Sequence, residues 1–147
     1  MEIQRILCPV DFSESSRVAM QAAIVLARER GAMLVLMHVL DHPPWLVEAT
    51  VYAPVALREH ARAAATQHLA VWRAEAVAAG VEVATKLVEG LAWDQIAVAA
   101  REDPRIEMIV MGTHGRTGFD RAMIGSVAER VVRQAPCAVL VVPEARR

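Results

Sequence analysis

Short apolar runs alternate with segments of helical periodicity along almost the whole chain. Each run has the length of an ordinary strand, and the segments between them carry apolar residues at intervals of three and four. Alternation of this kind predicts right-handed strand–helix–strand units, a mostly parallel sheet and helices on both of its faces. The expected strands are residues 3–9, 33–40, 81–88, 106–111 and 137–142, and the expected helices are residues 13–30, 55–79, 93–100 and 126–133. The sequence therefore predicts an α/β fold with one doubly wound, five-stranded sheet.

The fourth expected strand leads directly into two glycine turns. Gly112-Thr113-His114-Gly115 follows the strand, and Gly125-Ser126 opens the last expected helix. Glycine leaves room for a ligand's oxygens beside the backbone and permits positive φ. A helix N-terminus adds unpaired N–H groups and positive potential. Because ligands of doubly wound sheets bind beyond the carboxyl ends of the strands, the turns predict an anion site suited to phosphate. A capping box between Ser126 and Glu129 explains the same helix start equally well and is compatible with phosphate binding.

The composition narrows the class of ligand and the expected location. A chain of 147 residues fits one domain, here residues 1–147. The net charge of -1 and the scattered basic residues argue against nucleic acid as the main ligand. No apolar run is long enough to span a membrane and the first residues show no signal-peptide core, so we expect a soluble, cytoplasmic protein. Hydrophobic residues make up 55% of the chain and the mean hydropathy is +0.31, which suggests that a partner subunit covers part of the surface.

Several classes of enzyme and nucleotide-binding protein need residues that this chain lacks. Lys86 is the only lysine and follows no glycine, which excludes a Walker A loop. A thiol phosphatase built on Cys8 would need an arginine where Glu14 stands. A nicotinamide dehydrogenase would carry its three-glycine fingerprint where residues 9–13 lie. A phospho-acceptor receiver domain would need an aspartate after the third strand and a lysine after the fifth, and neither is present.

The histidines and cysteines do not form a recognisable metal or redox motif. His60 and His68 lie on the longest expected helix without a carboxylate or cysteine at ligand spacing, so we propose no dedicated metal site. Cys8 and Cys137 each lie in an apolar, strand-like run. We expect buried thiols there rather than a redox pair.

The segment from Asp41 to Pro54 is unusual for a connection between two elements. It contains three prolines and is too long for an ordinary loop. We interpret it as a lid or an interface. Its aromatic residues, Trp45 and Tyr52, fit an aromatic patch at a subunit boundary as well as a base-stacking role.

Three groups of residues together form the signature of a known family. They are Pro9-Val10-Asp11 with Ser13 after the first strand, Glu89-Gly90 with Ile96 and Ala100 after the third, and the pattern Gly112-x2-Gly115-x9-Gly125-Ser126. With them the chain resembles the universal stress protein family over essentially its whole length. The last pattern resembles that of the ATP-binding branch. Glu107 stands where the family often has aspartate, and we expect it to change a surface contact only.

This resemblance implies a sheet ordered 3-2-1-4-5, a nucleotide between the first and fourth strands, and a homodimer formed through the fifth strand, Ala138 to Val142. Carried over by position, Asp11 faces the ribose or phosphates, Val39 offers backbone contacts to adenine, and Met111 lines the base pocket. The other residues of the motif then surround the ribose and phosphates. The full set of expected nucleotide-binding residues is Pro9, Val10, Asp11, Val39, Met111, Gly112, His114, Gly115, Gly125, Ser126 and Val127.

Two of these residues can also be interpreted from their chemistry. A carboxylate just past the end of a strand, such as Asp11, can accept hydrogen bonds from ribose hydroxyls or help to hold Mg²⁺ on the phosphates. It can instead cap the helix that begins near Ser13. His114 in its glycine turn either touches the ligand or is simply solvated.

We therefore expect an ATP-binding regulatory or signalling protein, dimeric, that binds ATP with Mg²⁺. Nucleotide occupancy would change the surface that the protein shows to a regulated protein partner. We expect no enzyme beyond a weak ATPase, because no positioned lysine, arginine finger or general base is evident. Two alternatives remain open: a structural dimer module that binds no nucleotide, and a slow ATP hydrolase.

Overall fold

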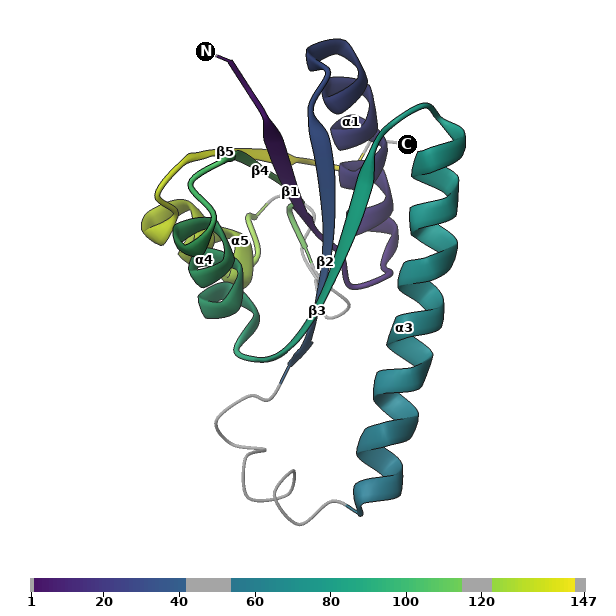
Figure 1. The fold of residues 1–147 in the computed structure, drawn as a ribbon. Coiled ribbons are helices and arrows are strands. Elements are labelled where there is room, and N and C mark those ends of the chain that lie inside the picture. Colours follow the sequence, from purple (N-terminus) through teal and green to yellow (C-terminus); the bar gives the residue numbers. More distant parts are fainter. Residues whose placement is uncertain (1, 42–53, 115–122, 145–147) are drawn as a thin grey trace.

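The computed structural model describes residues 2–41, 54–114 and 123–144. The elements alternate between strand and helix as the periodicity predicts, and their ends differ from the expected ranges by at most two residues. In chain order they are β1 (Arg5–Pro9), α1 (Glu14–Arg30), β2 (Met33–Asp41), α3 (Val55–Ala78), β3 (Val83–Gly90), α4 (Ala92–Glu102), β4 (Ile106–Gly112), α5 (Ser126–Gln134) and β5 (Ala138–Val142). Figure 1 shows them around one central sheet.

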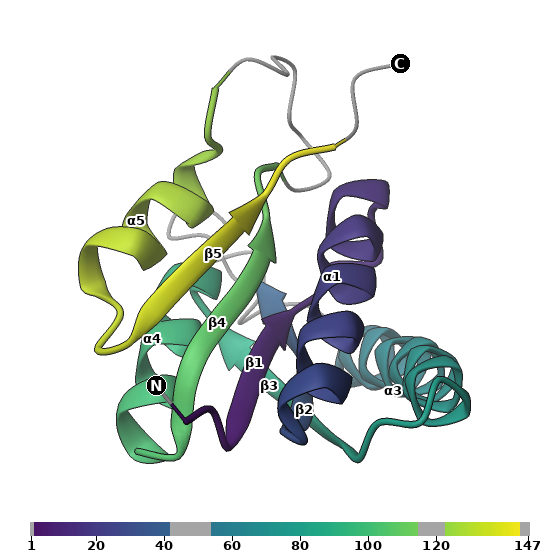
Figure 2. The same cartoon turned by 90° about the horizontal axis from the view of Figure 1, so that it is seen from above.

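The five strands form one parallel sheet in the order β3-β2-β1-β4-β5, which confirms the expected topology. Helices α1 and α3 lie on one side of the sheet, and α4 and α5 lie on the other (Figure 2). The chain builds outward from β1 to β3, then returns through α4 to β4 on the other side of β1. The strand order therefore reverses between β1 and β4, which is where such sheets open a crevice for ligands.

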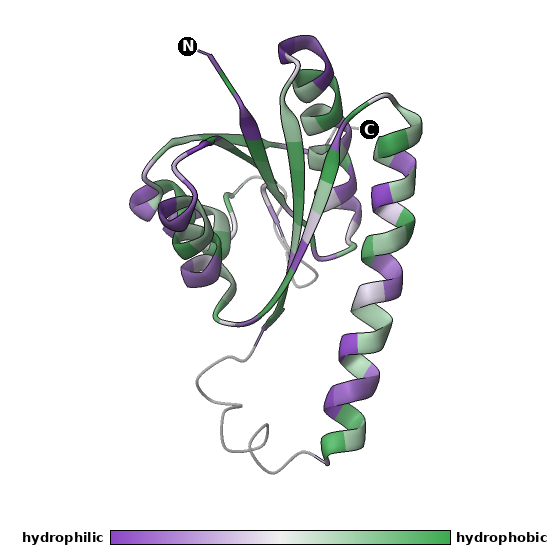
Figure 3. Ribbon diagram, viewed as in Figure 1, coloured by the Kyte–Doolittle hydropathy of each residue, from purple (hydrophilic) through white to green (hydrophobic). Residues whose placement is uncertain are grey.

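The central strands are apolar because both of their faces are covered. In β1, Ile6 and Cys8 point into the core under α1 and α3, whereas Leu7 points into the core under α4 and α5. All three side chains are fully buried. The hydrophobic colour runs along the strands, while polar residues mark the outer faces of the helices (Figure 3). This arrangement is the reason that the strands read as continuous apolar runs rather than as alternating ones.

The two cysteines differ in their surroundings, although neither forms a disulfide. Cys8 is buried as expected, and burial raises the pKa of its thiol to about 12. Cys137 is only partly buried, because it lies just before the edge strand β5. Partial burial also raises the pKa of the Cys137 thiol above its ordinary value.

Helix α1 begins and ends at residues whose chemistry fixes its position. Ser13 is the N-cap, and its hydroxyl oxygen accepts a hydrogen bond from the Ser16 N–H at 3.2 Å. Gly31 ends the helix in the left-handed region with φ 64°. The first turn of α1 lies against the end of β4, where Ser15 is buried and its hydroxyl accepts a hydrogen bond from the His114 N–H at 3.3 Å.

Helix α3 is the longest described helix and packs on the sheet with its C-terminal half. Its buried residues are Ala65, Leu69, Trp72 and Ala76. The N-terminal turns extend past the end of the sheet (Figure 1), and residues 54–62 are all exposed. Glu89 at the end of β3 pairs with two arginines of these turns, Arg58 at 3.7 Å and Arg62 at 3.3 Å.

The segment interpreted as a lid or an interface lies mostly outside the described residues, which leave out 42–53 with Trp45 and Tyr52. The described residues at its two ends adjoin regular elements: Asp41 is the last residue of β2, and Pro54 directly precedes α3. The carboxylate of Glu107 accepts an exposed hydrogen bond from the Gln4 N–H at 2.7 Å. In the described ranges no helix has the length and apolar character that crossing a membrane requires.

Candidate functional site

A cavity of about 720 Å³ opens at the carboxyl ends of β1, β2 and β4, at the point where the strand order reverses. The first turns of α4 and α5 form its other walls. Its volume lies within the range of small-molecule sites, about 300–1,000 Å³. The fold thus places the cavity where a doubly wound sheet binds its ligand.

Ten of the eleven residues expected to bind nucleotide line this one cavity. They come from four separate stretches of sequence that the fold brings together, at residues 9–11, 39, 111–114 and 125–127. The residues are Pro9, Val10, Asp11, Val39, Met111, Gly112, His114, Gly125, Ser126 and Val127. The eleventh, Gly115, lies outside the described residues.

Sequence reasoning missed several residues of the lining. Met37 belongs to the same face of β2 as Val39, two residues away, so the strand period could have identified it. Ala92 and Ile96 are four residues apart on α4 and share one helix face. Met123 and Ile124 also line the cavity, although both side chains are largely exposed.

Asp11 lines the cavity, and its carboxylate supports the start of α1. It accepts a hydrogen bond from the Ser13 N–H at 3.0 Å and another from the Ser13 hydroxyl. The Asp11 N–H donates to the Ser16 hydroxyl at 3.3 Å. The alternative role as a helix cap is therefore wrong in detail, because Ser13 is the N-cap and Asp11 holds that serine in place.

The two described glycines of the motif have a steric role that their spacing did not predict. Neither adopts positive φ, and a Cβ would meet protein backbone at both positions. At Gly112 it would lie 2.7 Å from the carbonyl oxygen of Ser15, and at Gly125 it would lie 2.7 Å from that of Thr113. Gly112 thus lets the end of β4 approach Ser15 of α1, and Gly125 lets the backbone before α5 approach Thr113. Spacing alone could not distinguish close packing from room for a ligand.

The predicted capping box at the start of α5 is wrong. Gly125 is the N-cap and supplies no side-chain hydrogen bond, while Ser126 is already the first helical residue. Glu129 instead pairs with Arg133 one turn later, at 2.9 Å. The first-turn N–H groups of α5 have no acceptor within their own helix, and Ser126, Val127 and Ala128 line the cavity.

His114 lies partly buried at the cavity wall. Its backbone N–H donates to the buried Ser15 hydroxyl, and its ring Nδ1 lies 2.9 Å from the Thr113 hydroxyl oxygen. This hydrogen bond joins the backbone just after β4 to the first turn of α1. His114 thus belongs to the described wall of the cavity.

The two sides of the cavity differ in chemistry. Met37, Val39 and Ile96 are apolar residues of the part formed by β2 and α4, where His38 and Asp41 also line the cavity. Asp11, Met111 and residues Gly125 to Val127 line the part nearer β1, β4 and α5. Within the described lining there is no lysine or arginine. The arrangement suits a ligand with one flat apolar part and one anionic part bound by N–H groups and the helix dipole.

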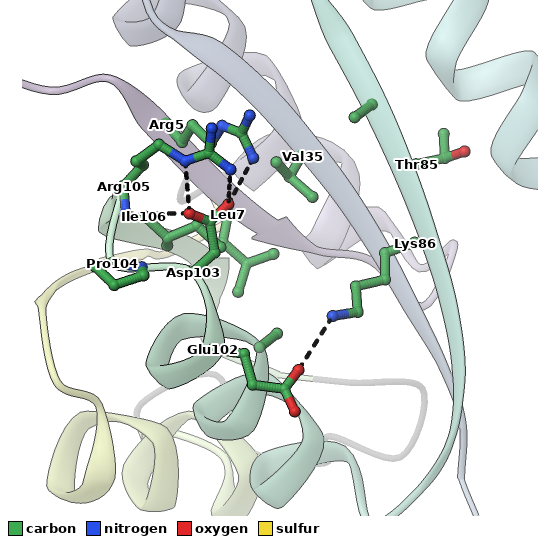
Figure 4. A pocket seen from close by; sticks show the side chains of 12 residues that line it. Arg5, Leu7, Val35, Thr85, Lys86, Glu102, Asp103, Pro104, Arg105 and Ile106 are labelled. Carbon is green, nitrogen blue, oxygen red and sulfur yellow. Dashed lines mark hydrogen bonds and ion pairs between the residues drawn. The ribbon is translucent and has the colours of Figure 1, made fainter.

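A second cavity, of about 500 Å³, lies at the opposite end of the sheet, near the first residues of β1 and β4 (Figure 4). Asp103 pairs with Arg5 at 2.5 Å and Arg105 at 2.9 Å, and Lys86 pairs with Glu102 at 3.7 Å. Hydrogen bonding from Arg105 lowers the pKa of the Asp103 carboxyl, despite partial desolvation. The basic groups of this cavity therefore already have acidic partners.

No cluster of three or more histidine, cysteine or acidic side chains that could hold a metal occurs in the part of the chain that the structure describes. His68 packs instead against the ring of Phe12, with ring centroids 4.9 Å apart.

Comparison with known proteins gives the same fold and a family. The sequence profile of the universal stress protein family matches residues 2–143. The universal stress protein MJ0531 of Methanocaldococcus jannaschii is 33% identical over 144 residues, which cover 98% of this chain and 84% of that protein. The structure of the hypothetical protein MJ0577 superposes with a TM-score of 0.86 at 26% identity, and the match covers 100% of both chains.

Two further structures with this fold hold nucleotides. A universal stress protein in complex with cAMP has a TM-score of 0.75 at 22% identity, covering 99% of this chain and 100% of that one. The universal stress protein from Archaeoglobus fulgidus in complex with dAMP has a TM-score of 0.68 at 22% identity, covering 96% and 98%. At this identity they show the shared fold. The family profile and the relative from Methanocaldococcus jannaschii together show that the chain belongs to the universal stress protein family.

Proposed function

We propose that this universal stress protein binds ATP with Mg²⁺ in the cavity between β1 and β4. The observation that carries the proposal is the joining of an apolar wall and a helix N-terminus at the point where the strand order reverses. Adenine would lie against Met37, Val39 and Met111, and the phosphates would lie near Gly125 to Val127. The complexes of two fold relatives with cAMP and dAMP support an adenine nucleotide as the ligand.

Two alanines allow a direct test of where the nucleotide binds. Ala92 lines the candidate cavity and Ala84 lines the second one, and both are partly buried. Ala92→Phe would fill the candidate cavity, so it should abolish binding in a calorimetric titration with ATP and Mg²⁺. Ala84→Phe should leave the affinity unchanged. Equal binding by both variants would place the nucleotide elsewhere.

Thermal unfolding separates nucleotide binding from the alternative of a nucleotide-free dimer module. At a ligand concentration of 100 times Kd, binding stabilises the folded state by about 2.7 kcal/mol. For a chain of this length that free energy raises Tm by roughly 8 °C. A wild-type Tm that does not change with ATP, ADP or AMP would contradict the proposal and favour the dimer module.

Asp11 can act on either the ribose or the metal, and the two roles predict different losses. If Asp11 helps to hold Mg²⁺ on the phosphates, Asp11→Ala should remove the dependence of ATP affinity on Mg²⁺. If Asp11 accepts hydrogen bonds from the ribose, the wild type should discriminate against a nucleotide that lacks both ribose hydroxyls, and Asp11→Ala should not. The phosphates themselves would rely on Mg²⁺ and backbone N–H groups, since the described lining offers no basic side chain.

The regulatory role is part of the same proposal. Binding without fast hydrolysis lets occupancy follow the nucleotide level, and occupancy would then set the surface shown to a protein partner. If the protein is a slow ATP hydrolase, its phosphate release should persist when the protein is purified further, and Asp11→Ala should abolish it. Both cysteines are free thiols, which agrees with the reducing cytoplasm that we propose as the location.

We include in the proposal a homodimer formed through β5. This strand pairs with β4 and lies at the edge of the sheet, and the side chain of Leu140 is 39% exposed. An apolar edge strand is a surface on which a second copy can pair. Light scattering should report a dimer for the wild type and a monomer for Leu140→Glu. The control Val71→Glu, at a residue 64% exposed on α3, should remain dimeric.

A further inference from the structure

Phe12 has the least favourable backbone conformation of the described non-glycine residues. Its φ is 65°, and no other described residue except glycine has positive φ. A bulky side chain disfavours this left-handed region, so the surrounding structure must hold Phe12 there. Such outliers cluster at binding sites.

The ring of Phe12 is held by side chains from two other elements. Its centroid lies 4.7 Å from that of His38 on β2, 4.9 Å from that of His68 and 5.3 Å from that of Trp72, both on α3. His38 is itself fixed, because its Nδ1 donates to the carbonyl oxygen of Val10 at 2.7 Å. The ring is thus clamped between β2 and α3.

Trp72, a buried member of this clamp, is also fixed from α1. The guanidinium of Arg17 lies 4.4 Å from the centre of the Trp72 ring and pairs with Glu75 at 3.0 Å. The residue that clamps Phe12 is therefore held by both its own helix and α1. We expect the ring of Phe12 to have little freedom to move while α3 stays in place.

The backbone of Phe12 connects this clamp to the cavity. Asp11 lines the cavity directly before it, and Ser13 caps α1 directly after it. The turn at Phe12 brings the Asp11 carboxylate onto the N–H of Ser13, at 3.0 Å. If the backbone of Phe12 relaxed to negative φ, Asp11 would turn away from both Ser13 and its place in the cavity wall.

We propose that Phe12 is a positioning residue for the nucleotide site, through which α3 holds Asp11 in the cavity wall. Helix α3 contributes no residue to the described lining of that cavity, and its contacts with the Phe12 ring reach the residue directly after Asp11. This inference rests on the proposed function, because it assigns the control of nucleotide affinity to a contact outside the site. The lining residues alone would not predict that nucleotide affinity depends on α3.

A double-mutant cycle tests whether Phe12 acts through Asp11. Calorimetric titration with ATP and Mg²⁺ would compare the wild type, Phe12→Ala, Asp11→Ala and the double variant. We expect Phe12→Ala to weaken binding by about tenfold and to have no further effect in the Asp11→Ala background. Wild-type affinity in Phe12→Ala, or an equal loss in both backgrounds, would overturn the inference.

Phe12→Gly separates the conformation of the turn from the clamp. Glycine adopts φ 65° without strain but offers no ring to hold it there. Its affinity should lie between those of the wild type and Phe12→Ala. Circular dichroism of all variants would confirm that the fold is retained. A Phe12→Gly affinity below that of Phe12→Ala would show that the turn is not what Phe12 supplies.

Two histidines on α3 give a matched pair for the role of that helix. His68 contacts Phe12, whereas His60 lies on the exposed N-terminal turns, and both side chains are exposed enough for the fold to tolerate alanine. His68→Ala should weaken ATP binding by about twofold to fivefold, and His60→Ala should not change it. Equal affinities of the two variants would contradict a role for α3. A wild-type chain that binds no nucleotide would instead refute the proposed function itself, and this inference with it.

Discussion

Replacing Gly112 by alanine tests whether this glycine serves packing or ligand binding. The added Cβ would lie 2.7 Å from the carbonyl oxygen and 2.8 Å from the carbonyl carbon of Ser15. Both are backbone atoms in the first turn of α1, so they cannot move aside as the end of a flexible side chain would. Either β4 or α1 must shift, and the hydrogen bond from the His114 N–H to the Ser15 hydroxyl must lengthen.

The expected loss of stability follows from these two effects. Overpacking a rigid site costs about 1–3 kcal/mol, and losing one hydrogen bond costs about 1 kcal/mol. We therefore expect Gly112→Ala to lower the free energy of unfolding by about 2–4 kcal/mol. With about 3 °C of Tm for each kcal/mol in a chain of this length, Tm should fall by roughly 6–12 °C.

The assay is urea unfolding of the nucleotide-free protein, with Gly31→Ala as the control. Gly31 has φ 64° and open space around its Cβ position, so alanine there adds backbone strain without a clash. We expect that control to lose about 1 kcal/mol. If Gly112→Ala unfolds like the wild type and loses only nucleotide affinity, the steric argument is refuted and the glycine serves the ligand.

Three further measurements check other parts of the structure. Ser13→Ala should destabilise the protein by about 1 kcal/mol, because it removes the N-cap of α1. Ser126→Ala should change stability by less than about 0.5 kcal/mol, because Ser126 is already inside α5. Equal losses of stability would show that Ser126 caps its helix after all. The lowered pKa of Asp103 means that its ionised form is favoured by folding, so wild type should exceed Asp103→Asn in stability at neutral pH. That difference should vanish as pH falls through the folded pKa, below the ordinary 3.8, and a difference that grows in acid would refute the assignment. In the native protein an aromatic disulfide reagent should modify Cys137 before Cys8, whose thiol pKa of about 12 and complete burial keep it unreactive until the chain unfolds.

The sequence predicts the fold well because burial on both faces of a parallel sheet leaves a strong pattern. In β2 that pattern extends over almost the whole strand, and the helix ends at Gly31 and Gly80 follow from the residue type alone. The starts of β1 and β3 lie two residues after the starts that the apolar pattern predicts. Ile3 and Val81 are buried just before β1 and β3, so an apolar side chain precedes the first ladder hydrogen bond in each case.

The site could be predicted in outline and not in its contacts. The topology places the ends of β1 and β4 together, so residues at those ends had to share a crevice. The steric role of Gly112 depends on Ser15, and the clamp on Phe12 depends on His68 and Trp72. These partners are distant in sequence and carry no local signal.

The two halves of α3 are held to the rest of the molecule by different kinds of contact. The C-terminal half contributes Leu69, Trp72 and Ala76 to the core, so it should exchange its amide hydrogens only when the whole chain unfolds. The N-terminal turns are exposed, and their described ties to the sheet are the ion pairs of Arg58 and Arg62 with Glu89. Exposed ion pairs weaken as salt screens them. This end of the helix should therefore fray independently and more readily at high ionic strength, as a small subglobal unit of its own.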